Sequence, residues 1–288
     1  MRFLGGQKVS LLGLGTGRLA SLGAGYRRSQ AAECLRTAAE NGLNLIDTAD
    51  SYGSGDCERL LGRLLREIRH PFLISTKAGY TYCRLPAFLS PLNQIGKKIL
   101  QKVGPRQCFF PTTIRQRLEE SLKRLRRERV EFYFLHDPTP EALRDDDLTA
   151  ELQKAKEHGK IGEIGISFSS TAATQIPRDH PFSSLLQTQI NPWIPLSLRG
   201  NHEIIANHVF GGEKILQDDG RLESLATKEG LTPRQLLIAF AAQQKGVSTV
   251  LVGTGRAEHL RENLGGVGKK LSPATLTSLT ELGRGKRV

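Results

Sequence analysis

The chain has 288 residues, of which 38% are hydrophobic and 24% charged, a composition typical of a folded globular protein with a substantial core. No apolar run reaches the roughly 18 residues of a membrane-spanning helix, and glycine and charge interrupt the N-terminal residues before a signal-peptide core forms. The four cysteines show neither CxxC pairing nor zinc-ligand spacing. We therefore expect reduced thiols in a cytoplasmic protein, with no membrane partner.

The net charge of +12 could indicate a nucleic-acid partner, and the basic residues are densest between residues 114 and 131. Ile114, Leu118, Leu122 and Leu125 form one apolar stripe there, which predicts an amphipathic helix with basic side chains at its other positions. No aromatic side chains interleave the basic run as a base-stacking surface would require. We interpret it as a solvated outer helix face and expect no nucleic-acid binding. The alternative, a DNA-binding surface, would show steep salt dependence.

Short apolar runs alternate with amphipathic segments along the chain. Strands are predicted at residues 8–15, 43–47, 71–77, 130–136, 161–167, 183–190, 202–210 and 247–253. Helices are predicted at residues 29–42, 57–68, 114–131, 148–159, 221–230, 232–246, 255–266 and 272–285. Ser29 is expected to cap the first of these helices.

The predicted strands are continuous apolar runs, which is typical of a parallel sheet covered on both faces. About eight strand–helix repeats in a chain of this length predict a (β/α)8 TIM barrel. We expect one barrel domain over residues 1–288, with a short N-terminal hairpin and an extra C-terminal helix. A doubly wound sheet is the alternative. The segment 78–111 after the third strand is expected to be a long functional loop.

Three successive strands end on ionisable residues of different types, namely Asp47, Lys77 and His136. Active sites of such barrels lie where the strands end, so these side chains should meet at one mouth. Tyr52 follows five residues after Asp47, in a loop that could fold over them. Each residue taken alone could be structural, as a helix cap, a solvated lysine or a core histidine. Their coincidence on adjacent strands favours a site.

The four side chains make chemical sense as a proton donor. A phenol, with a pKa near 10, is a poor acid at neutral pH, and a neighbouring ammonium lowers that pKa. Lys77 could supply the cation, Asp47 could hold Lys77, and His136 could donate a second hydrogen bond to the same substrate oxygen. The site contains no nucleophile and no metal ligands. A hydride from a nicotinamide is the natural reductant.

Seven motifs in order carry a resemblance to a known family. They are GLGTG at residues 13–17, DTADSYG at 47–53, STK at 75–77, LHDP at 135–138, GIS at 165–167, QTQINP at 187–192 and GTGRAEHLRENL at 253–264. The chain resembles the aldo-keto reductase superfamily from about residue 13 to residue 266. This resemblance implies a (β/α)8 barrel that binds NADPH without a Rossmann domain. It also implies Tyr52 as general acid, with Asp47, Lys77 and His136 completing a catalytic tetrad.

The resemblance assigns the nicotinamide half of the cofactor to the barrel mouth. Thr16 and Gly17 match a loop that approaches it, Asp47 lies beside its ribose, and Ser167 and Gln187 match the residues that hold the carboxamide. Two positions depart from the family.

The first departure is Phe168, at a position that is usually Asn, which removes one carboxamide hydrogen bond. The second is Asn207, which aligns with the aromatic residue that stacks on the nicotinamide. Phe210 is the alternative for that stacking role.

The adenosine half falls on the predicted helix at 255–266, whose N-terminus is a natural anion site. Thr254 is expected to be the N-cap, and Arg256 is the candidate for the 2′-phosphate because a guanidinium matches phosphate in a forked geometry. His259 falls where the family often has Arg, and Glu262 and Asn263 match the adenine-contacting pair. We therefore expect NADPH/NADP+ rather than NADH.

These observations predict an NADPH-dependent reductase of a small-molecule aldehyde or ketone. The alternative is a cofactor-binding regulatory or scaffold protein on the same fold, which the two departures keep open. Tyr80, Tyr82 and Phe88 are candidates for the substrate pocket, and Trp193 could line the pocket or cover the rim. Asp50 is expected to have a structural role in a turn.

Overall fold

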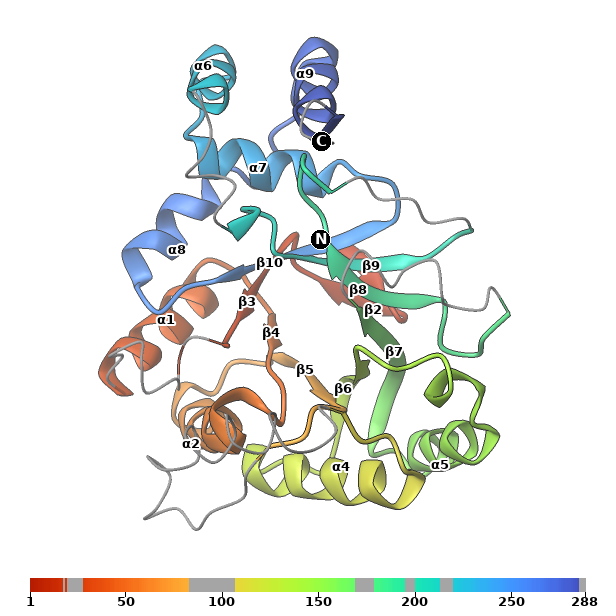
Figure 1. The fold of residues 1–288 in the computed structure, drawn as a ribbon. Helices are drawn as coiled ribbons and strands as arrows, with labels where there is room; N and C mark the ends of the chain where they lie inside the picture. Colours follow the sequence, from red (N-terminus) through yellow and green to blue (C-terminus); the bar gives the residue numbers. More distant parts are fainter. Residues whose placement is uncertain are drawn as a thin grey trace.

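The computed structural model describes residues 1–17, 19, 28–82, 107–168, 179–194, 200–212 and 220–284. Within them, eight parallel strands close into a barrel in the order β10-β3-β4-β5-β6-β7-β8-β9 (Figure 1). The strands are β3 (Leu12–Gly15), β4 (Leu45–Asp47), β5 (Leu73–Ala78), β6 (Val130–His136), β7 (Ile161–Phe168), β8 (Leu185–Gln189), β9 (Glu203–Asn207) and β10 (Val247–Gly253). The predicted (β/α)8 barrel is confirmed, and the doubly wound sheet was wrong.

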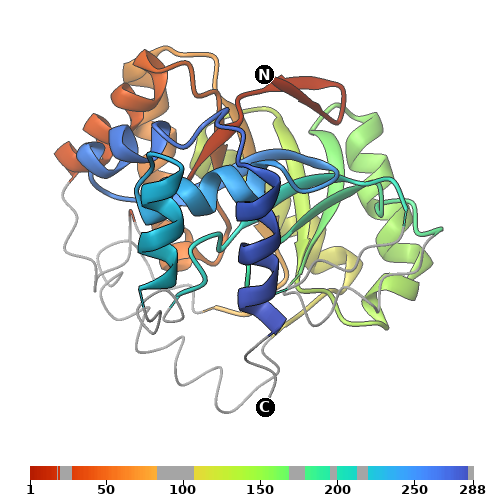
Figure 2. The same cartoon turned by 90° about the horizontal axis from the view of Figure 1, so that it is seen from above.

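Helices surround this barrel (Figure 1). The described helices are α1 (Arg28–Glu40), α2 (Asp56–Ile68), α4 (Pro111–Leu125), α5 (Asp146–Glu157), α6 (Arg221–Lys228), α7 (Pro233–Ala242), α8 (Ala257–Leu264) and α9 (Pro273–Arg284), with short 3-10 turns η1 (Tyr52–Gly55) and η3 (Ala142–Arg144). The predicted extra C-terminal helix is α9. It stands beside α6 against α7 (Figures 1 and 2), and apolar side chains from all three helices form a separate small core.

Several predicted boundaries differ from the structure by a few residues, and two of the differences have a clear physical reason. The basic helix ends at Leu125 rather than at residue 131, because Arg126 takes a left-handed conformation with φ 57° and β6 begins at Val130. Ser29 lies inside α1, which is already helical at Arg28, so it does not cap that helix.

The predicted N-terminal hairpin is also present, as antiparallel strands β1 (Arg2–Leu4) and β2 (Gln7–Val9). Its Leu4 and Val9 are fully buried and pack with residues of the barrel interior. Figure 2 shows the hairpin at one end of the barrel. It closes that end with apolar side chains. Among the described helices, none has the length and apolar character needed to cross a bilayer.

Strand periodicity explains how the site is built. On a strand, alternate residues face the same side, so the interior of the barrel receives every second side chain. Leu45 of β4 and Phe132 and Phe134 of β6 belong to the inner apolar cluster. Asp47 and His136 share their parity and come later along the same strands. The interior therefore changes from apolar to ionisable toward the carboxyl ends of the strands.

Candidate active site

Asp47 and Lys77 form a buried ion pair at the ends of β4 and β5. Lys77 Nζ lies 2.7 Å from Asp47 Oδ2, and the two side chains are only 2% and 5% exposed. The same ammonium donates to the backbone carbonyl of Thr48 at 2.7 Å. Each charge is expensive to bury alone, so the pair and its hydrogen bonds fix the geometry of the site.

The second oxygen of Asp47 receives two further donors. Ser75 Oγ donates to Asp47 Oδ1 at 2.8 Å and Gln187 Nε2 donates to it at 2.9 Å. Ser167 Oγ in turn donates to Gln187 Oε1 at 2.9 Å. A buried hydrogen-bonded chain therefore runs across the barrel from β7 through β8 to β4 and holds the Asp47 carboxylate on both oxygens. The STK motif contains Ser75 but the sequence indicated no role for it, although its position two residues before Lys77 places it on the same face of β5.

Tyr52 begins the η1 turn, the next element after β4, and four residues separate the two. The turn depends on left-handed backbone at Gly53 (φ 58°) and Ser54 (φ 55°). Lys77 Nζ lies 5.2 Å from the centroid of the Tyr52 ring. A Cβ atom added at Gly17 would lie 3.4 Å from the Tyr52 ring, an ordinary van der Waals distance, so the Gly17 backbone lies close beside the ring.

The pKa values of this pair follow from burial and charge. The Lys77 ammonium is the largest influence and lowers the pKa of Tyr52, but burial and the Asp47 carboxylate together outweigh it and raise that pKa above 10.0. Burial is the largest influence on Lys77 and lowers its pKa, yet Asp47 and Tyr52 raise it further, so it lies above 10.5. The predicted lowering of the Tyr52 pKa by Lys77 is therefore present but is not the net result. Both groups are protonated at neutral pH.

His136 ends β6 and faces the same mouth. Its ring centroid lies 6.4 Å from that of Tyr52, in an edge-on arrangement. Tyr80 also packs edge-on against His136, with ring centroids 4.7 Å apart, and its hydroxyl donates to Asp137 Oδ2 at 2.5 Å. The structure thus brings together all four residues of the predicted tetrad and adds Tyr80 as a neighbour of His136.

The predicted nicotinamide residues lie around this group. Thr16 follows β3, and its Oγ1 and backbone N–H both donate to the carbonyl oxygen of Asp47, at 2.8 Å and 2.9 Å. Ser167 lies near the end of β7 and Gln187 in the middle of β8, and their side chains are bonded to each other. Phe168 is 4% exposed and belongs to the main apolar core, so its side chain offers no hydrogen bond in place of the missing Asn.

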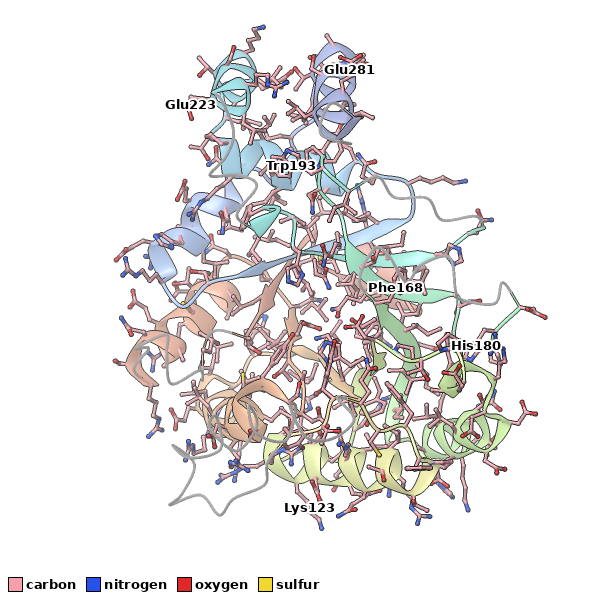
Figure 3. All side chains as sticks on the ribbon, in the orientation of Figure 1. Lys123, Phe168, His180, Trp193, Glu223 and Glu281 are labelled. Carbon is pink, nitrogen blue, oxygen red and sulfur yellow. The ribbon has the colours of Figure 1, made fainter. Side chains whose placement is uncertain are left out.

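Two aromatic candidates pack against the small core beside α7. Trp193 is 7% exposed and packs in the small core with α6, α7 and α9, beside α7 in Figure 3. Phe210 is half-buried against the same core, with the guanidinium of Arg234 5.8 Å from its ring centroid. Trp193 therefore has a packing role in the small core. Phe88 lies outside the described residues, as do most residues of the predicted loop 78–111.

The residues predicted for the adenosine half gather at α8. Arg256 is exposed, occupies the N-cap backbone position, and its side chain makes no capping bond. Thr254 lies two residues earlier, where its Oγ1 accepts from the Arg256 N–H at 3.1 Å. The predicted N-cap at Thr254 is therefore wrong. His259 is half-buried and Glu262 exposed.

Asn263 supplies a test of whether this end of the chain fits a nucleotide. Its side chain is 2% exposed, and its Oδ1 atom makes no hydrogen bond to any part of the protein that the structure describes. A buried acceptor of this kind is costly unless a ligand donor satisfies it. An adenine amino group has the required chemistry, so the α8 residues fit the adenosine half of the cofactor.

Two buried arginines were missed. The sequence placed the basic side chains of α4 on a solvated face, but Arg117 pairs with Asp50 and Arg124 pairs with Glu58. Asp50 itself is fully buried and has the structural role expected of it. Each partner lies more than 60 residues away along the chain, so helical periodicity could not have revealed it.

Comparisons with known proteins agree with this architecture. A sequence model described as the aldo/keto reductase family matches residues 11–208 and 197–284. A Glycine max protein called "Probable aldo-keto reductase 1" is 26% identical, over 96% of this chain and 86% of its own length.

Solved structures show the same fold at low identity. A thermostable aldo-keto reductase in complex with the inhibitor epalrestat has a TM-score of 0.72 at 24% identity, covering 98% of this chain and 99% of its own. The glycerol dehydrogenase of Gluconobacter oxydans has a TM-score of 0.73 at 22% identity, covering 95% of this chain and 91% of its own.

Proposed function

Because the chain belongs to the aldo/keto reductase family, a family of oxidoreductases that act on carbonyl groups, we propose that it reduces an aldehyde or ketone of a small organic molecule with NADPH. The observation that carries the proposal is the buried Asp47–Lys77 pair, with the Lys77 ammonium 5.2 Å from the centroid of the Tyr52 ring. A protein that only bound a nucleotide would have no use for this arrangement.

Each residue of the site has a different role in the proposed carbonyl reduction. NADPH, when bound, supplies a hydride to the carbonyl carbon. Tyr52 gives the phenol proton to the carbonyl oxygen, and His136 donates a hydrogen bond to the same oxygen. Lys77 stabilises the phenolate that remains, and Asp47 keeps Lys77 charged and in place. The same groups serve alcohol oxidation in reverse.

The cofactor would be held at both ends by this chain's own residues. Thr16, Gly17, Asp47, Ser167 and Gln187 surround the place for the nicotinamide half, and Thr254, Arg256, His259, Glu262 and Asn263 that for the adenosine half. The buried, unsatisfied oxygen of Asn263 supports the second assignment.

The test is carbonyl-dependent oxidation of NADPH by the purified protein across a broad panel of aldehydes and ketones, with the alcohol product identified. We expect turnover with at least one class of carbonyl. NADPH binding without any turnover would instead favour the regulatory or scaffold alternative. That alternative draws on Phe168, whose apolar side chain replaces a carboxamide partner, and on Gln187, whose amide is already bonded to Asp47 and Ser167.

Arg256→Ala tests the preference for NADPH. Arg256 is exposed at the start of α8, where the helix dipole and the guanidinium both favour a phosphate. A charge-assisted hydrogen bond contributes about 1.5–3 kcal/mol, so we expect the Kd for NADPH to rise roughly 10- to 100-fold. The Kd for NADH should stay nearly unchanged. Equilibrium titration of both cofactors measures the two values.

Arg261→Ala is the matched control, because Arg261 lies on the same helix but donates to Thr37 of α1 at 3.2 Å. It should change neither Kd. If Arg256→Ala weakened NADPH and NADH equally, Arg256 would not be the 2′-phosphate contact.

A further inference from the structure

Two buried ion pairs join helix α4 to the segment that carries Tyr52. Arg117 Nη1 lies 3.4 Å from Asp50 Oδ2, with the side chains 6% and 0% exposed. Arg124 Nε lies 2.7 Å from Glu58 Oε2, with the side chains 11% and 0% exposed. Asp50 precedes Tyr52 by two residues and Glu58 follows it by six, so the two pairs lie on either side of the η1 turn along the chain.

Arg117 also reaches the structure behind His136. The same Nη1 atom donates to the backbone carbonyl of Tyr80 at 2.6 Å. The Tyr80 ring packs edge-on against His136 and its hydroxyl donates to Asp137. One guanidinium therefore contacts both the segment that leads to Tyr52 and the residue that supports His136.

Arg124 supports the far end of the same turn. Gly55, the last residue of η1, has φ 89°, and a Cβ atom added there would lie 2.9 Å from Arg124 Cδ. The arginine stem therefore lies directly against the turn. Glu58 also accepts from Thr76 Oγ1 at 2.6 Å, which ties this pair to β5 next to Lys77.

Stability alone does not account for four buried charges in this place. Well-packed apolar side chains usually stabilise a core as well as a buried ion pair does, whereas a buried pair fixes a specific geometry. Gly53 and Ser54 of the Tyr52 turn both take left-handed conformations, which are costly for a non-glycine residue such as Ser54. Such a turn is held in place only if surrounding contacts fix its geometry.

We propose that Arg117, paired with Asp50, is a positioning residue that fixes Tyr52 and His136 relative to each other, so that both can donate to one carbonyl oxygen. The inference rests on the proposed carbonyl reduction for its catalytic consequence. Arg117 contacts Asp50 and Tyr80, whereas the proposed cofactor-binding residues lie on elements other than α4. Its loss should therefore affect the chemical step and leave cofactor binding unchanged.

Arg117→Met is the first test, because it removes the charge and keeps an unbranched side chain. Small displacements of a reacting group cost up to about 100-fold in rate, so we expect kcat to fall roughly 10- to 100-fold. The KM for the carbonyl and the Kd for NADPH should change less than about threefold. Because the pKa of Tyr52 depends on its position relative to Lys77 and Asp47, a displacement of Tyr52 should also shift the alkaline limb of the kcat profile.

Arg117→Lys should restore most of the lost rate. In the wild-type protein one nitrogen makes both contacts, and a lysine ammonium has three donors with which to reproduce them. Lys123→Met is the control on the same helix, because Lys123 is exposed and points outward from α4 (Figure 3). It should leave kcat, KM and the pH profile as in the wild type.

Arg117→Met leaves Asp50 buried without this partner, which could lower Tm by about 5 °C or more or prevent folding. The double variant Asp50→Asn/Arg117→Met removes both charges and keeps the experiment decisive. We expect it to regain most of the lost Tm but not the lost kcat. Recovery of kcat together with Tm would show a purely structural role and overturn the proposal.

Nuclear magnetic resonance of isotope-labelled tyrosine gives a readout that needs no turnover. The chain has five tyrosines, and Tyr52→Phe identifies the signal of Tyr52 by its loss. The signal should shift in Arg117→Met and in the double variant, but not in Lys123→Met. If the Tyr52 signal shifts in Arg117→Met but the wild type reduces no carbonyl, the proposed reaction is wrong. The proposal that Arg117 positions Tyr52 is then still supported. If the signal and kcat both stay as in the wild type, Arg117 does not position Tyr52.

Discussion

Tyr52→Phe is expected to lower kcat for carbonyl reduction roughly 100- to 10,000-fold, the usual contribution of a general acid, while the Kd for NADPH stays nearly unchanged. The substitution removes the proton that the carbonyl oxygen must receive and keeps the ring that packs beside Gly17 and His136. Steady-state kinetics with the best carbonyl of the panel, together with a cofactor titration, measure both quantities.

The pH profile of the wild type sharpens this prediction. Burial and Asp47 raise the pKa of Tyr52 above 10.0 despite Lys77, so the phenol stays protonated throughout the neutral range. Ionisation of Tyr52 should therefore not change the rate of reduction near neutral pH. The rate should fall through this group only above the ordinary tyrosine pKa. Tyr52→Phe should lack that alkaline limb.

Tyr80→Phe is the comparison for Tyr52→Phe, because it removes a hydroxyl from the same mouth. It keeps the ring against His136 and loses only the hydrogen bond to Asp137. A single hydrogen bond to a charged group contributes about 1.5–3 kcal/mol, part of which water replaces at this half-buried position, so we expect a loss of less than about 10-fold. Near wild-type carbonyl reduction by Tyr52→Phe would contradict the proposed role of Tyr52.

The barrel and the convergence of the candidate site residues could be predicted from the sequence because both depend on local patterns. β4 and β6 end on Asp47 and His136, and Lys77 is the last residue but one of β5. Since parallel barrel strands end at one mouth, the order of residues along the chain was enough to place Asp47, Lys77 and His136 together.

Other features depend on distant partners and could not be predicted in this way. The charges of α4 looked like a solvated face, because the pattern of one helix cannot show that Arg117 meets Asp50, 67 residues away. The net direction of the shift in the Tyr52 pKa could not be predicted from the sequence either. The sequence gives the sign of the Lys77 influence, but the opposing effects of burial and of Asp47 depend on the folded geometry.

Lys77→Met is the substitution with the largest expected combined effect on activity and stability. Lys77 is 2% exposed, and its removal leaves the Asp47 carboxylate buried without its cation. Among the residues that the structure describes, Ser75 and Gln187 remain as its side-chain donors. Breaking a buried pair in this way costs about 3–5 kcal/mol. We expect the free energy of unfolding to fall by about that amount, as measured by denaturant titration, and kcat to fall at least about 100-fold, because Tyr52 loses the cation that stabilises its phenolate.

The dependence on pH separates the two effects of this substitution. The pKa of Lys77 is raised above 10.5 in the folded protein, so its charge stabilises the fold at every pH below its unfolded value. That contribution is lost as the pH rises through the folded value. Wild-type stability should therefore decline in the alkaline range through this group, and Lys77→Met should lack that part of the decline.

The double variant Asp47→Asn/Lys77→Met removes both buried charges, and it should recover most of the lost stability while kcat remains low. Such a result would mean that the pair is present for the chemistry of Tyr52 rather than for the fold, since an uncharged pair of similar volume would hold the barrel mouth together as well. If the double variant regained kcat along with its stability, the Lys77 ammonium would have no part in the acid chemistry of Tyr52.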